Sequence, residues 1–262
     1  MMRVRVLVLR AAGTNCDSET AYAFHKAGAE AELVHINELV RKEKDLAEYH
    51  ILAIPGGFTY GDDISAGRIL ANELKHKLLD ELLSFVEEGK LIIGICNGFQ
   101  VLVKAGFLPA LKGYGRAQEA TLGWNDSGRF EDRWVYLKVE PGNRCAFTEG
   151  LEGMLYMPVA HAEGKFIAPQ EVIRSIEENS QVVLRYASPS GELSGYPWNP
   201  NGSLGNIAGI CDPKGRIFGL MPHPERHIDG LQHPRWTREG PKEEGDGMGI
   251  FRNAVRYVRD NL

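Results

Sequence analysis

A cysteine between two glycines is the residue of this chain whose surroundings most clearly predict chemistry. Residues 91–95 form an apolar run typical of a buried strand, and an apolar helical pattern follows it and ends at Gly106. Cys96 lies between the two, and Gly94 and Gly98 complete a Gly-x-Cys-x-Gly pattern. This is the pattern of a nucleophile elbow, with sulfur in place of the serine oxygen.

The two glycines fit a very tight turn, in which a Cβ atom at either position would collide with neighbouring backbone. Such a turn raises the thiol above the edge of a sheet, at the N-terminus of a helix, where the helix dipole favours thiolate over thiol. A free cysteine is more often a plain buried residue. Because that interpretation does not require Gly94 and Gly98, the sequence predicts Cys96 as a nucleophile.

A cysteine nucleophile needs a base, and the base needs a carboxylate that orients it. Two segments offer His-x-Glu: His161 with Glu163, and His223 with Glu225. Prolines on both sides of His223 prevent a helix there and hold the imidazole on a rigid loop directly after a predicted strand. The residues alone favour His223 with Glu225 as the base and its carboxylate, and they leave His161 with Glu163 open. A further alternative is that both histidines are ordinary surface or capping residues.

Acyl chemistry at a thiol also needs backbone N–H groups to stabilise an oxyanion. Asn97, the residue after the nucleophile, offers one, and Gly56 or Gly57 at the end of a neighbouring predicted strand offers another. The glycine pair fits a plain turn after a strand equally well. A metal site made by His223, Glu225 and His227 is disfavoured, because the prolines disrupt the helix that such spacing would use.

No cofactor motif accompanies these residues. The sequence has no Gly-x-Gly-x-x-Gly after its first strand and no Gly-x-x-x-x-Gly-Lys-Ser/Thr, so it predicts no dinucleotide or P-loop nucleotide site, and we expect neither a metal nor a cofactor in this chain.

The elements around these residues alternate between strand and helix over the first ~110 residues, as a parallel sheet requires. This predicts an α/β fold with a doubly wound, mostly parallel sheet, in which sites lie beyond the carboxyl ends of the strands. The glycine pair and Cys96 both fall at such ends. The predicted elements are strands at 4–9, 31–36, 51–54 and 91–95, a helix that ends at Gly28, and one long helix with apolar positions at Leu70, Leu74, Leu78, Leu82 and Val86 that is capped by Gly89.

The rest of the chain is less regular. Residues 119–140 are predicted to form a hairpin-like pair of strands, with the clearest strand at 134–139. Two short strands at Ile207–Cys211 and Ile217–Leu220 flank a turn, and a final helix is expected over 248–258. The irregular stretches 186–206 and 230–247 are interpreted as surface insertions within one domain, which we expect to span residues 1–262.

Composition places the chain among soluble globular proteins, with 43% hydrophobic and 25% charged residues. No apolar run is long enough to cross a membrane, and Arg3 and Arg5 lie inside the first strand-like segment instead of preceding an apolar signal core. The formal net charge of −5 argues against nucleic-acid binding. The cysteines form no Cys-x-x-Cys pair, and their wide separation suits a reducing compartment. We therefore expect a cytoplasmic protein.

Taken together, the motifs resemble those of the class I, triad-type glutamine amidotransferases. Within this family they are most similar to the glutaminase subunits of phosphoribosylformylglycinamidine synthases, which act in purine biosynthesis. The resemblance covers nearly the whole chain. The chain departs from the family pattern by extra length around 170–206 and 230–247, and it has Ala11 and Ala12 where the family often has a proline. It is carried by the segments Gly-Thr-Asn-Cys-Asp at 13–17, Pro-Gly-Gly-Phe-Thr-Tyr-Gly-Asp-Asp at 55–63, Gly-Ile-Cys-Asn-Gly-Phe-Gln at 94–100, Asn-Asp-Ser-Gly-Arg-Phe at 125–130, Ala-His-Ala-Glu-Gly at 160–164 and Met-Pro-His-Pro-Glu-Arg at 221–226.

The resemblance implies a role for each site residue. It implies that Cys96 attacks the side-chain amide of glutamine, that His223 acts as acid and base, and that Glu225 orients His223. The backbone N–H groups of Gly57 and Asn97 would form the oxyanion hole. Gln100, one helical turn after the nucleophile, and Gly56 would contact the substrate.

The resemblance also implies partners. Ammonia would pass to a separate synthetase subunit, which uses ATP and Mg²⁺, and a small accessory subunit would complete the assembly. We expect no nucleic acid and no membrane as a partner. Two alternatives remain: a stand-alone cysteine hydrolase, such as a peptidase or a γ-glutamyl hydrolase on a similar fold, and a non-catalytic interaction subunit, which would require a triad residue to be missing.

Overall fold

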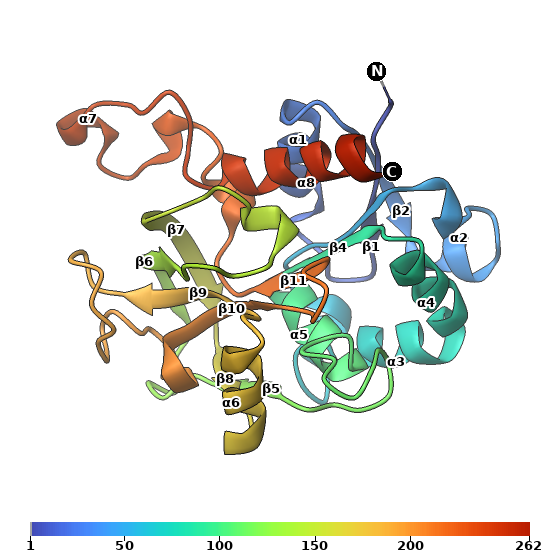
Figure 1. Cartoon of the computed structure of the whole chain (residues 1–262), viewed down its shortest axis with the longest axis horizontal. Coiled ribbons are helices and arrows are strands. Elements are labelled where there is room, and N and C mark those ends of the chain that lie inside the picture. Colours follow the sequence, from blue (N-terminus) through green and yellow to red (C-terminus); the bar gives the residue numbers. More distant parts are fainter. Residues whose placement is uncertain (1) are drawn as a thin grey trace.

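A nine-stranded sheet with the order β2-β1-β3-β4-β11-β10-β9-β6-β7 forms the centre of the molecule. The structure is a computed structural model that describes residues 2–262. Figure 1 shows helices on both faces of the sheet, as the predicted doubly wound α/β fold requires. Among the described residues, none of the helices has the length and apolar character that crossing a membrane would take.

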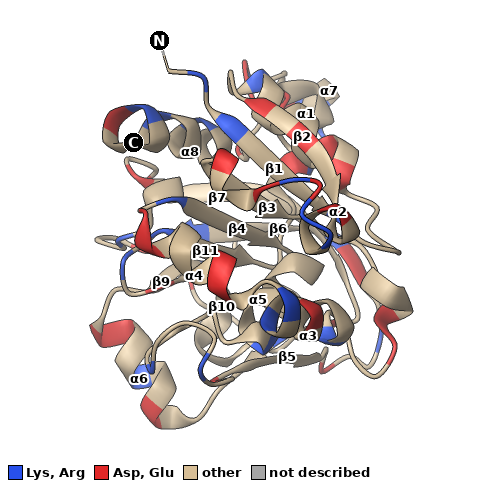
Figure 2. Ribbon diagram, turned by 90° about the vertical axis from the view of Figure 1, so that its right-hand side faces the viewer, with Lys and Arg blue, Asp and Glu red and all other residues tan. Residues whose placement is uncertain are grey.

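One half of the sheet is parallel and ends where the predicted site residues begin. It consists of β1 (Arg5–Arg10), β2 (Glu30–His35), β3 (Ile51–Ile54), β4 (Leu91–Ile95) and β11 (Ile217–Leu220). The strands β3, β4 and β11 carry no charged residue and are buried throughout, and Figure 2 shows the charged residues on the helices and loops around them. Because these strands run parallel, their carboxyl ends meet at one edge of the sheet.

Helices cover this parallel half from both sides. On one side lie α1 (Asp17–Lys26) and α8 (Met248–Asn261), whose Phe24 and Phe251 rings meet edge to face at 5.0 Å between centroids. On the other side lie α3 (Arg68–Lys77) and α5 (Asn97–Ala105), which pack against each other. The chain also forms α2 (Ile36–Val40), α4 (Leu79–Glu87), α6 (Gln170–Glu178) and α7 (Trp236–Glu239).

The other half of the sheet is antiparallel, and the sequence predicted two of its four strands, at 207–211 and 134–139. It contains β10 (Ile207–Cys211), β9 (Val182–Ala187), β6 (Glu131–Val139) and β7 (Met154–His161). The region around 170–206, interpreted as an insertion, therefore holds α6 and β9, and only its later part is irregular.

The predicted hairpin at 119–140 is wrong. β5 (Thr121–Trp124) pairs with β8 (Glu163–Ile167) in a separate two-stranded sheet, whereas β6 pairs with β7 and β9. Leu122 on β5 and Phe166 on β8 are directly paired and both buried. The partner of β5 thus comes from about forty residues further along the chain, and local sequence carries no signal for it.

The predicted long helix is also wrong, because it is divided into α3 and α4 at Leu78. The backbone at Leu78 has φ −135° and ψ 17°, which is not helical. The apolar stripe crosses the break because both helices pack on the same core. A signal was present in the charges: α3 ends on three basic residues and α4 begins with two acidic ones, as two separate helix dipoles favour.

Candidate active site

The turn between β4 and α5 has the geometry of a nucleophile elbow. Cys96 has φ +52° and ψ −105°, a strained backbone for a residue with a side chain. A Cβ atom on Gly98 would lie 1.9 Å from the carbonyl oxygen of Ile54, and one on Gly94 would lie 2.6 Å from the carbonyl oxygen of Gly98. The expectation that both positions exclude a side chain is confirmed.

The second His-x-Glu pair lies beside this thiol. The backbone N–H of Cys96 donates to the carbonyl oxygen of Leu220, the last residue of β11, so the loop that follows β11 begins next to the elbow. His223 lies on that loop, and its Nδ1–H donates to Oε1 of Glu225 at 2.6 Å. Both side chains are buried.

Gly56 marks the point at which these groups converge. A Cβ atom there would lie 2.7 Å from Cε1 of His223, 3.2 Å from Sγ of Cys16 and 3.4 Å from Cβ of Cys96. Only glycine leaves room for these three side chains around the end of β3. Gly56 thus lies where the side chains of the candidate site meet.

The charge of Glu225 governs the protonation of His223. Burial alone lowers the pKa of His223, but the carboxylate of Glu225 and the sulfurs of Cys96 and Cys16 outweigh it and hold this pKa well above 6.5. The imidazolium form is therefore available near neutral pH, as a group that must protonate a leaving amine requires.

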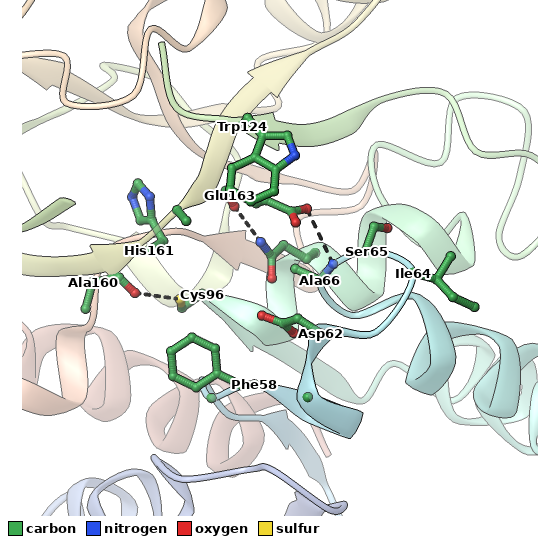
Figure 3. A pocket seen from close by; sticks show the side chains of 14 residues that line it. Phe58, Asp62, Ile64, Ser65, Ala66, Cys96, Trp124, Ala160, His161 and Glu163 are labelled. Atoms are coloured by element: carbon green, nitrogen blue, oxygen red, sulfur yellow. Dashed lines mark hydrogen bonds between the residues drawn. The ribbon is translucent and has the colours of Figure 1, made fainter. Parts of the chain in front are cut away.

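A cavity of about 370 Å³ opens onto the thiol. Figure 3 shows Cys96 and the carboxylate of Asp62 at its base, and Trp124 and Glu163 above them. Sγ of Cys96 lies 3.7 Å from the carbonyl oxygen of Ala160 at the end of β7. The cavity is lined by Gly57, Phe58, Gly61, Asp62, Ile64, Ser65, Ala66, Cys96, Gln100, Trp124, Ala160, His161, Ala162 and Glu163.

Comparison with known proteins fits this geometry. The family described as a CobB/CobQ-like glutamine amidotransferase domain matches residues 3–258. The chain belongs to this family. This confirms the resemblance seen in its motifs.

Relatives of this glutamine amidotransferase cover nearly its whole length. The phosphoribosylformylglycinamidine synthase subunit PurQ of Dehalococcoides mccartyi is 56% identical over 99% of both chains. The subunit of the same name from Methanococcus maripaludis is 45% identical over 97% of both chains. A chain from "Structure of PurLQS from Thermotoga maritima" has a TM-score of 0.75 and 33% identity, and the match covers 98% of this chain and 100% of that one.

The predicted base of the other pair, His161, lies on the cavity wall of the amidotransferase but has a different environment. Burial, with a smaller contribution from the positive charge of His223, lowers the pKa of His161 to about 3. An imidazole with that pKa stays neutral near pH 7 and cannot serve as an acid there. The structure therefore brings His223, and not His161, together with a carboxylate beside Cys96.

Gln100 and Gly57, two of the predicted substrate and oxyanion residues, line the same cavity. Oε1 of Gln100 accepts from Nδ2 of Asn97 at 3.0 Å, and Nε2 of Gln100 donates to the carbonyl oxygen of Glu163. The backbone N–H of Asn97 lies in the first turn of α5, where a helix has no internal acceptor for it. Gly57 has φ +144° and forms an isolated β-bridge with Thr14.

Cys16 is a site residue that sequence reasoning missed. It begins α1, and Nη2 of Arg226 donates to its sulfur at 3.1 Å. One atom each of Cys16, His223 and Glu225 lie within 4.8 Å of one another. The guanidinium of Arg226 thus already supplies a positive charge at this sulfur. The expectation that this chain binds no metal stays a prediction.

Asp62, also missed, carries a titration that can be measured. Burial, together with the negative charge of Glu163, raises the pKa of Asp62 to about 6. A carboxyl group with a raised pKa in the folded state costs stability once it ionises, so this cost grows as pH rises from about 4 to about 6 and is full above that. We expect Asp62→Asn to be more stable than the parent at pH 8, by about 1 kcal/mol after allowance for solvent screening, and to lose this advantage towards pH 4.

Urea unfolding of the two proteins across this pH range measures the effect. The neighbouring residue Asp63 is exposed, so Asp63→Asn is the matched control. If both substitutions change stability with the same dependence on pH, the environment described for Asp62 is wrong.

Proposed function

We propose that this chain is the glutaminase subunit of a phosphoribosylformylglycinamidine synthase. It hydrolyses glutamine to glutamate and ammonia and delivers the ammonia to a synthetase subunit that makes formylglycinamidine ribonucleotide. The observation that carries the proposal is the thiol of Cys96, on a strained elbow beside His223 and Glu225, in a chain that shares 56% identity over 99% of its length with a subunit of that synthase.

In the first half of the reaction, the thiolate of Cys96 attacks the δ-carbon of the glutamine side chain. The oxyanion that forms accepts hydrogen bonds from the backbone N–H groups of Asn97 and Gly57. His223, held protonated by Glu225, donates its proton to the amide nitrogen, and the C–N bond breaks to release ammonia. The product on the enzyme is a γ-glutamyl thioester on Cys96.

In the second half, neutral His223 takes a proton from water as the water attacks the thioester. The C–S bond breaks, glutamate leaves, and the thiolate of Cys96 and the imidazolium of His223 are restored. Glu225 keeps the imidazole in one orientation throughout through its 2.6 Å hydrogen bond. Gly56 and Gln100 belong to the proposed substrate-binding site, since Gly56 lies against the side chains of His223 and Cys96 and Gln100 lines the cavity.

The partner assignment follows from the names of the relatives. Each of the two described above is a PurQ subunit of phosphoribosylformylglycinamidine synthase, and the Thermotoga maritima assembly is called PurLQS. By analogy, this chain works with a synthetase subunit and a small accessory subunit; ATP and Mg²⁺ belong to the synthetase, and this chain holds no cofactor. Residues 1–262 form one amidotransferase domain in this proposal, and the complex is cytoplasmic.

We expect the isolated chain to be a poor glutaminase that its synthetase activates. Ammonia released into water is protonated and lost as a nucleophile, so hydrolysis must be coupled to a waiting acceptor. The oxyanion donor at Gly57 lies in a loop that the synthetase can align by binding its productive state more tightly. A misdirected donor costs ~3 kcal/mol of transition-state stabilisation, a rate factor on the order of hundreds.

The experiment measures glutamate formation by the purified chain, first alone and then with synthetase, accessory subunit, formylglycinamide ribonucleotide, ATP and Mg²⁺, with the amidine product followed in parallel. Activation together with amidine formation supports the proposal. A full rate without the partner would contradict the coupling, and peptide cleavage in place of glutamine hydrolysis would support a stand-alone hydrolase.

A further inference from the structure

Large apolar side chains are exposed around the mouth of the cavity that holds Cys96. Phe58, Ile64 and Trp124 line this cavity and are 45%, 87% and 66% exposed. Figure 3 shows these three residues on different sides of the cavity. The ring of Phe130, which is 48% exposed, lies 6.3 Å from the ring of Phe58. We call these four side chains the apolar rim.

The apolar rim joins two segments that are distant in the sequence. Phe58 and Ile64 belong to the loop that follows β3, Trp124 ends β5, and Phe130 directly precedes β6. The fold thus gathers these side chains at one opening and leaves them uncovered. Apolar groups that are exposed together in this way are typical of surfaces that bind another protein.

Ile64 is the member of the rim whose position costs most in the isolated chain. Its backbone has φ +71°, in the left-handed region that a β-branched residue rarely adopts. Tyr60 and Asp62 in the same loop also have positive φ values, +55° each. The loop therefore bears backbone strain while it exposes its largest aliphatic side chain. A partner that buries this side chain would offset both costs.

The same loop also reaches the reacting groups. Gly57 at its start lines the cavity and is the proposed oxyanion donor. Asp62 accepts a hydrogen bond at 3.2 Å from Nδ2 of Asn97, the residue that follows the nucleophile. A molecule that binds Ile64 therefore contacts a short segment that ends on the catalytic elbow.

The charges of this loop indicate which partner fits it. Residues 58–66 contain Asp62 and Asp63 and no lysine or arginine. A second copy of this chain that docked through the same surface would bring two such loops together, and their like charges oppose that contact. The loop fits a different protein, with an apolar depression flanked by basic side chains.

We propose that the apolar rim is the docking surface for the synthetase subunit, with Ile64 as its anchor. This inference rests on the proposed glutaminase function. The synthetase must receive ammonia before water protonates it, and the rim lies around the opening onto Cys96. A synthetase seated on the rim covers this opening and keeps the released ammonia from the solvent.

The test adds increasing amounts of this chain to a fixed amount of synthetase with its accessory subunit and substrates, and follows amidine formation. Ile64→Ser and Trp124→Ser should each raise the concentration of chain that gives half the maximal rate by about tenfold or more, as the loss of an interface hot spot does. Ile64→Val keeps an apolar β-branched side chain and should stay close to the parent value.

Tyr22→Ser is the matched control, because Tyr22 is 61% exposed on α1 and does not line the cavity. We expect it to behave as the parent does. Thermal unfolding of each variant checks that it is folded before the titration.

The proposal is overturned if Ile64→Ser or Trp124→Ser keeps the parent value, or if Tyr22→Ser or Ile64→Val shifts as far as Ile64→Ser. Sedimentation of the chain alone gives a further check. A dimeric parent with a monomeric Ile64→Ser variant would assign the rim to a second copy of this chain and would also overturn it. Failure of the proposed function looks different, because no amount of the parent chain would then support amidine formation from glutamine.

Discussion

Cys96→Ala is expected to abolish glutamine-dependent amidation by the assembled synthase and to spare amidation from added ammonium. Sulfur is needed only to release ammonia from glutamine, whereas the synthetase uses ammonia from either source. The loss with glutamine should reach several orders of magnitude, as it does when the nucleophile of a triad is removed. Both nitrogen donors are assayed with the same preparation of complex.

Cys145→Ala is the matched control, because Cys145 is another buried thiol but does not line the cavity. We expect it to keep glutamine-dependent activity. An equal loss with glutamine and with ammonium in Cys96→Ala would mean that the substitution breaks the assembly, and the role of Cys96 as nucleophile would lose its support.

His223→Ala should reduce glutamate formation by ~10³-fold or more, far beyond the effect of His161→Ala. The first substitution removes an imidazolium beside the thiol whose protonation is maintained near neutral pH, and the second removes an imidazole that stays neutral. Steady-state glutamate release by the two variant complexes decides between them. If His161→Ala is the inactive variant, the catalytic assignment belongs to the first His-x-Glu pair.

The parallel half of the fold was predictable because its signals are local. The run at 91–95, the two glycines and the following helix are adjacent in the chain, and the strands Ile51–Ile54 and Ile217–Leu220 have the predicted bounds. Because parallel strands end at one edge, this part also indicated that Gly56, Gly57 and Cys96 lie together.

What could not be predicted depends on contacts between distant segments. β5 pairs with β8 instead of with β6, and no local pattern distinguishes the two pairings. Cys16 reaches the site only because Gly56 leaves space for its sulfur, and Asp62 is drawn in by hydrogen bonding to Asn97.

The most direct test of the account is to find the γ-glutamyl thioester. The complex is mixed with glutamine, quenched in acid during turnover and digested, and peptides with each of the four cysteines are analysed by mass spectrometry. Cys16, which also lies against His223, is the internal control for a thiol of similar surroundings. We expect the γ-glutamyl group on Cys96 alone. Its presence on another cysteine, or on none while glutamate accumulates, would contradict the proposed nucleophile.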